Sequence, residues 1–111
     1  MLVVKRDKGG SGQGVTIEAI DGRDDFDRRL CEAIVAMQAC VEAMPEDATL
    51  RAVLRQLEAI KRWTAGGATM NAEQVQSIVM GLQAQREMAD FPRETALVIA
   101  VHNFVLRQMG R

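Results

Sequence analysis

The chain has few of the side chains that enzyme active sites use. Among its 111 residues there are one histidine, two cysteines, no tyrosine and 4% aromatic residues. A zinc site needs a cluster of Cys, His or carboxylate ligands, and the sequence has no CxxC motif, no HExxH motif and no second histidine. Neither Ser11 nor Ser77 lies in a Gly-x-Ser-x-Gly motif. The sequence therefore predicts no catalysis, no metal centre and no cofactor.

An excess of charge of one sign is also absent. The chain has 14 basic and 15 acidic residues, for a net charge of −1. No excess of positive charge therefore points to binding of a nucleic acid or a membrane surface. No run of about 18 apolar residues predicts a transmembrane helix. In residues 1–8 the charges follow a very short apolar stretch, the reverse of a signal peptide. We expect one cytoplasmic domain that binds neither nucleic acid nor membrane.

Residues 1–22 differ in composition from the rest of the chain. Gly9, Gly10, Gly12 and Gly14 lie between two short apolar runs. This pattern fits either a flexible arm or a short β-hairpin with a glycine-rich loop. A phosphate-binding P-loop would need a Lys-Ser/Thr pair opening a helix, and none follows these glycines. We therefore divide the chain into this arm or hairpin and a helical domain over 23–111.

Two helices are predicted in the first half of that domain. Over about 24–44 the apolar residues recur every three or four positions, and Pro45 ends the pattern. Over about 47–64 a second apolar face follows, and Gly66-Gly67 end it in a turn. The apolar faces comprise Phe26, Leu30, Ile34, Met37, Val41 and Met44 in the first helix, and Leu50, Val53, Leu54, Leu57 and Ile60 in the second.

A third helix is predicted from Asn71 to about Met88. Asn71 as N-cap and Gln74 three residues later match a capping box. Gly81 lies in the middle of this helix, where glycine costs about 1 kcal/mol relative to alanine. We expect a close helix crossing there, since no side chain keeps the partner away. Its apolar face is assigned to Val75, Ile78, Val79 and Leu82.

A fourth helix, over about 90–109, is apolar on every side in its middle, 96–101. Such a helix must be covered on most sides, so we place it at the centre of the fold. The expected architecture is all-α: a compact antiparallel four-helix bundle.

The remaining reactive residues have ordinary explanations. His102 lies in the most apolar helix, so we interpret it as a hydrogen-bonded core histidine rather than a general base. Cys31 and Cys40 are nine residues apart, which on one helix at about 100° per residue places them on opposite faces. We expect both to be free thiols.

Two surfaces are candidates for binding a partner rather than for catalysis. Met80, Met88 and Ala84 lie beside the assigned apolar face of the third helix, where an exposed patch would dock a partner. Another face of the second helix is lined by Arg51, Arg55, Glu58 and Arg62, with Lys61 beside them, and it is the only basic stripe. An RNA-binding surface normally also has aromatic side chains on which bases stack, and only Trp63 is available here.

The second half of the chain resembles a known family. Leu54–Ile60 contains a Gln-Leu pair, and Ile78–Glu87 carries the pattern Gly-x-x-Ala-x-x-Glu, followed by an acidic, proline-bearing turn. With the helix spacing from Phe26 to Met109, these features resemble the small helical immunity proteins of bacterial type VI secretion systems. The resemblance is to the family that neutralises NAD(P)-degrading effector toxins.

This resemblance implies a cytoplasmic monomer that binds a cognate effector toxin and occludes its active site. Toxins that act on NAD or nucleotides need cationic pockets for phosphates, so an acidic patch would fit them. The candidate toxin-binding residues are Asp24, Asp25, Asp27, Met80, Glu87 and Asp90. The alternative function is a helical adaptor or secretion chaperone that binds a partner protein, and such a protein would be expected to dimerise.

Overall fold

Helices account for most of residues 19–109, the part of the chain that the computed structural model describes. This part contains no strand, so the predicted all-α class is confirmed for it. The predicted N-terminal arm or hairpin lies outside the described residues, apart from 19–22. The elements are α1 (Arg23–Ala43), α2 (Ala48–Trp63), the 3-10 turn η2 (Ala65–Gly67), α3 (Ala72–Ser77), α4 (Met80–Glu87) and α5 (Pro92–Met109).

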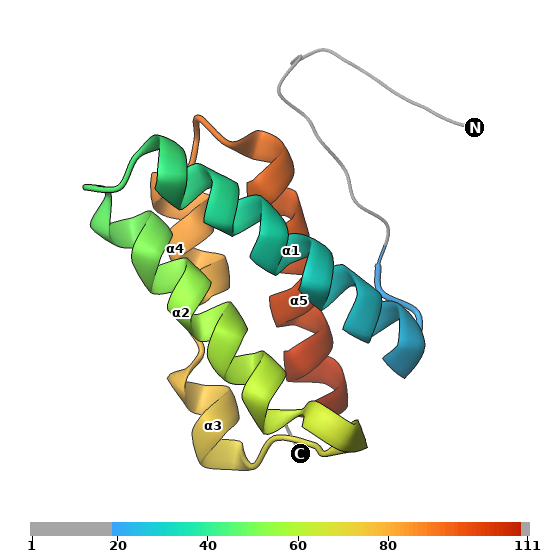
Figure 1. Cartoon of the computed structure of the whole chain (residues 1–111). Coiled ribbons are helices and arrows are strands. Elements are labelled where there is room, and N and C mark those ends of the chain that lie inside the picture. Colours follow the sequence, from blue (N-terminus) through green and yellow to red (C-terminus); the bar gives the residue numbers. More distant parts are fainter. Residues whose placement is uncertain (1–18, 110–111) are drawn as a thin grey trace.

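The helices α1 and α2 form an antiparallel hairpin, side by side in Figure 1. Asp47 caps α2 by accepting a hydrogen bond from the Leu50 N–H at 3.1 Å. At the far end, the Arg23 guanidinium donates to the carbonyls of Thr64, at 2.5 Å, and Gly67, at 3.3 Å. Arg23 thus satisfies the Thr64 carbonyl, which the end of α2 leaves without an intrahelical partner, and the Gly67 carbonyl of η2.

The predicted third helix is two helices rather than one. The capping box of Asn71 and Gln74 is present as expected. The chain then leaves the helical conformation at Ile78, whose ψ is 116°, and α4 begins only at Met80. The prediction of one helix from Asn71 to Met88 was therefore wrong. Consecutive β-branched residues at the break favour extended backbone, which contributes to it.

Two side chains from distant parts of the sequence bind the backbone freed at this break. Gln56 of α2 accepts a hydrogen bond from the Val79 N–H at 2.8 Å and donates one to Gln83 at 2.7 Å. His102 of α5 accepts one through Nδ1 from the Gly81 N–H at 3.0 Å. Tertiary hydrogen bonds therefore replace the helical ones that the break removes.

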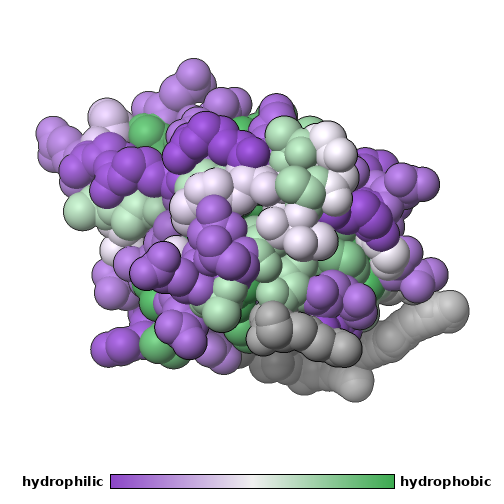
Figure 2. All heavy atoms as spheres, turned by 90° about the horizontal axis from the view of Figure 1, so that it is seen from below, coloured by the Kyte–Doolittle hydropathy of each residue, from purple (hydrophilic) through white to green (hydrophobic). Residues whose placement is uncertain are grey.

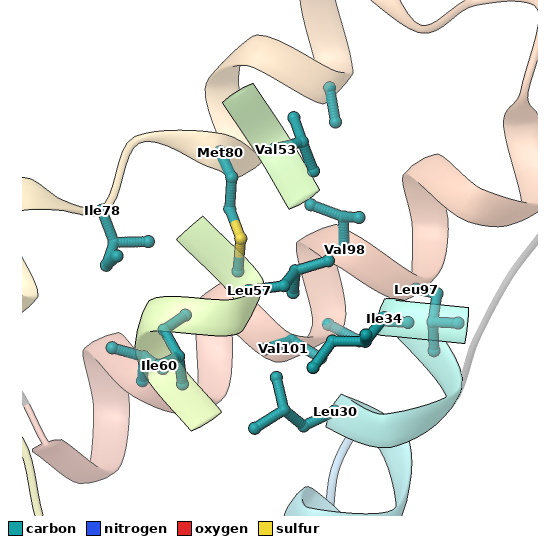
Figure 3. Packing of buried hydrophobic residues seen from close by; sticks show 14 of the residues in the cluster. Leu30, Ile34, Val53, Leu57, Ile60, Ile78, Met80, Leu97, Val98 and Val101 are labelled. Carbon is teal, nitrogen blue, oxygen red and sulfur yellow. The ribbon is translucent and has the colours of Figure 1, made fainter. Parts of the chain in front are cut away.

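The core lies where α1, α2, α4 and α5 meet, and α5 packs against α1, α3 and α4. The rings of Phe26 and Phe104 stack with their centroids 4.7 Å apart. In Figure 3, Met80 points inward among side chains of α2 and α5. The predicted central position of α5 is confirmed by its buried residues Leu97, Val98, Ala100, Val101, Phe104, Val105 and Met109.

Candidate protein-binding surfaces

The acidic residues at the start of α1 are largely engaged within the chain. Asp25 accepts a hydrogen bond from the Asp21 N–H at 3.0 Å and pairs with Arg28 at 2.5 Å. The bond from Asp21, and then that from Arg28, hold the pKa of Asp25 below its ordinary value. Asp27 pairs with Arg23 at 3.1 Å. Only Asp24 of this group is exposed without an ion pair among the described residues.

The second acidic group lies at the opposite end of α2. Glu87 accepts a hydrogen bond from the Thr49 hydroxyl at 2.7 Å, next to the start of α2, whereas Arg23 and Asp27 lie next to Thr64 at its end. Thr49 and Thr64 are about 22 Å apart along a helix that rises 1.5 Å per residue. The structure therefore does not bring the predicted acidic residues together into one patch. Asp90 is exposed in the turn before α5.

The methionine patch predicted on the third helix does not exist. Met80 is 0% exposed, and Met88 and Ala84 are also buried, so Met80 is a core residue and not a surface contact. The break at Ile78 resets the helical phase, which turns Met80, Ala84 and Met88 inward. Val79 and Leu82, which were assigned to the core, are 45% and 54% exposed instead.

A groove of about 580 Å³ runs between the middle of α1 and the first half of α5. Its charged lining residues are two basic and two acidic side chains, and its apolar ones include Val35 and Leu97. Val35 is the most exposed large apolar side chain of the described residues, at 65%. The groove is lined by Arg28, Cys31, Glu32, Val35, Ala36, Arg93, Glu94 and Leu97.

Sequence reasoning did not identify this groove. Its α1 side had one signal: Val35 is apolar but lies opposite the core face that includes Phe26, Leu30 and Met37. The α5 side had no comparable signal, because the first turn of α5 is polar in any case. Only the packing of α1 against α5 brings the two sides together.

The two cysteines are free, as predicted, and they differ in exposure. Cys31 is exposed in the groove, whereas Cys40 is buried. Burial, with a smaller contribution from Glu94, raises the pKa of the Cys40 thiol. Among the described residues no cluster of three or more His, Cys, Asp or Glu side chains has the arrangement to hold a metal ion.

His102 holds a structural position. Its Nδ1 accepts from the Gly81 N–H, and burial lowers its pKa while a hydrogen bond to the Ile78 backbone raises it by less. An added Cβ at Gly81 would collide with Nδ1 and lie 3.2 Å from Cγ of the same ring. The close crossing predicted at Gly81 is thus confirmed, and its partner is the histidine.

The end of the molecule that carries η2 and α3 has a different surface. Figure 2 views this end and shows pale, small residues gathered between purple hydrophilic side chains. Ala65, Gly66, Gly67 and Ala68 are all exposed there. The left-handed φ of Gly66, 67°, and of Gly67, 86°, explains why glycine occupies this turn. This backbone conformation is sufficient to explain the glycines of the turn.

No family model, curated protein or solved structure matches the chain. The resemblance to immunity proteins therefore stays a prediction from the sequence. Within residues 19–109, every helix is too short or too polar to span a bilayer.

Proposed function

We propose that this chain is an immunity-type protein that binds a toxin domain and blocks its active site, with the α1–α5 groove as the binding surface. The observation that carries this proposal is the composition of the groove. It is lined by the apolar Val35 and Leu97 together with the charged Arg28, Glu32, Arg93 and Glu94. An apolar centre with a charged rim is the usual anatomy of a protein interface.

The stiffness of the groove supports the same function. Both of its walls are helices with buried core faces, and the stacked rings of Phe26 and Phe104 join them. A surface that is already ordered loses little conformational entropy when it binds. An inhibitor that must hold a toxin tightly benefits from this preorganisation.

The acidic candidates take different roles in this proposal. Asp25, Asp27 and Glu87 already bind groups of their own chain. Asp24 lies one helical turn before Arg28 and so adds an exposed carboxylate to the α1 side of the groove, whereas Asp90 is exposed in the turn that precedes α5. These two exposed carboxylates are the ones that we assign to a cationic pocket of the toxin.

The runner-up is a helical adaptor or secretion chaperone, because a groove between two helices also fits an amphipathic helix of a partner. The two functions differ in what is bound. An inhibitor binds a folded toxin domain as a one-to-one complex, whereas an adaptor binds an isolated helical or unfolded segment and is expected to dimerise.

Co-expression tests the proposal. The product of each gene that adjoins this one is expressed alone and together with this chain, and growth and the mass of any purified complex are measured. We expect growth to be restored and a one-to-one complex to form. Continued toxicity without a complex would overturn the proposal. An obligate dimer that binds only unfolded segments would favour the adaptor.

A further inference from the structure

The outward face of α2 carries more positive than negative charge, because Arg51, Arg55 and Arg62 share it with one carboxylate, Glu58. On α1, the guanidinium groups of Arg23, Arg28 and Arg29 all pair with carboxylates of the same helix. None of the ion pairs within residues 19–109 uses a basic residue of α2. Arg55 and Arg62 are both exposed, and their spacing of seven residues places them on one face.

A hollow of about 270 Å³ lies beside this face, between α2 and α3. Arg55 is the only charged residue among those that line it, and no acidic side chain does so. The polar lining residues are Gln56 and Ser77, and the apolar ones are Ala52, Ala59, Trp63 and Ile78. A small apolar hollow thus has a cationic edge.

We propose that this hollow and the adjoining arginines form a second docking surface, which binds an acidic polypeptide segment with one aliphatic side chain. The carboxylates of the segment pair with Arg55 and Arg62, and the aliphatic side chain fills the hollow beside Trp63. Arginine and tryptophan are the residue types that most often dominate binding at protein interfaces.

A polypeptide fits this surface better than a nucleic acid. Bases of single strands stack on aromatic side chains, and the hollow offers only Trp63, with alanines and Ile78 for the rest. The volume of about 270 Å³ suits one aliphatic side chain.

This surface is independent of the proposed toxin-binding groove. The groove is made by α1 and α5, whereas the hollow is made by α2 and α3, and the two share no lining residue. A result that disproves binding at one site therefore does not disprove binding at the other. If the acidic peptide still binds while toxin is bound, the two partners occupy separate sites.

Fluorescence anisotropy of a labelled peptide tests the proposal. The probe is a short peptide of aspartates and glutamates with one central leucine, and the controls are a lysine version and a version with serine in place of leucine. The charge-reversal variant is R55E/R62E. Its matched control is R86E/R107E, which makes the same change in net charge at exposed arginines of α4 and α5.

We expect the acidic leucine peptide to bind, with weaker binding as salt rises. R55E/R62E should weaken binding at least about tenfold, which corresponds to about 1.4 kcal/mol, while R86E/R107E should stay close to the native chain. A59L, which fills the hollow, should remove the preference for leucine over serine. Thermal melts confirm that each variant is folded.

Three results would overturn the proposal. The first is equal binding of the acidic and lysine peptides, and the second is equal loss in both arginine double variants. The third is tighter binding of a single-stranded oligonucleotide of the same charge, with its loss in R55E/R62E, because this would assign the surface to nucleic acid.

Discussion

Nδ1 of His102 accepts a hydrogen bond from the backbone N–H of Gly81 at 3.0 Å, which joins the start of α4 to the middle of α5. The absence of a side chain at Gly81 is what allows the imidazole to come this close. The pair holds α4 against α5 directly after the break at Ile78. It gives the lone histidine a structural role.

The substitution G81A should destabilise the protein even though alanine is the better helix former. Its Cβ would displace His102, at a cost of about 1–3 kcal/mol, and break the hydrogen bond, at a further cost of about 1 kcal/mol. Together these exceed the gain of about 1 kcal/mol in helix propensity. Urea unfolding measures the difference. Q85A, at an exposed position of the same helix, is the control and should change stability little. A net increase in the stability of G81A would contradict the geometry.

Stability should fall in mild acid because of His102. Burial lowers the pKa of this imidazole in the folded chain below the ordinary value of 6.5, so the unfolded chain takes up the proton first. The free energy of unfolding therefore decreases as the pH falls through about 6.5, and this decrease ends below the folded-state pKa. Protonation of Nδ1 would also remove the acceptor for the Gly81 N–H.

Urea unfolding at a series of pH values checks this dependence. The variant H102Q has no titrating group at this position and should lack that part of the pH dependence. Identical slopes for H102Q and the native chain between about pH 7 and pH 5 would show that His102 is not responsible.

Arg23 should contribute more to stability than its neighbour Arg28. Arg23 binds two backbone carbonyls at the end of α2 and η2, and its guanidinium lies 5.7 Å from the centre of the Phe26 ring. R23A should cost about 1–2 kcal/mol. R28A removes a pair whose arginine is 66% exposed and should have little effect. Thermal denaturation compares the two, and equal losses would contradict this ranking.

The exposed thiol of Cys31 reports on the groove. In the folded chain an alkylating reagent should modify Cys31 and leave the buried Cys40 intact, because burial excludes the reagent and raises the pKa of the Cys40 thiol. Mass spectrometry identifies the modified residue. Bound toxin should protect Cys31, and rapid alkylation of Cys31 in the complex would place the interface elsewhere.

Local patterns predicted most of the helices. The helix predicted over 24–44 is observed at Arg23–Ala43, and the one predicted over 47–64 at Ala48–Trp63. These limits depend on Pro45, Asp47 and the glycines of η2, which act on their own neighbourhood. Such signals can be read without knowledge of the tertiary structure.

The break between α3 and α4 could not be predicted in the same way. Its hydrogen bonds come from Gln56 and His102, which are distant from Val79 and Gly81 in the sequence. Since the break shifts the helical phase, it also made the prediction of an exposed Met80 wrong. The candidate groove was missed for a related reason, because it exists only where α1 packs against α5.

The most direct test of the central claim, that the α1–α5 groove binds a toxin, is calorimetric titration of the toxin identified by co-expression with the native chain, with V35D and with L106D. Both substitutions place a carboxylate at an exposed apolar position, but only Val35 lies in the groove. We predict that V35D weakens binding by about 2 kcal/mol or more, whereas L106D binds as the native chain does. Unchanged affinity of V35D, or an equal loss in L106D, would contradict the account.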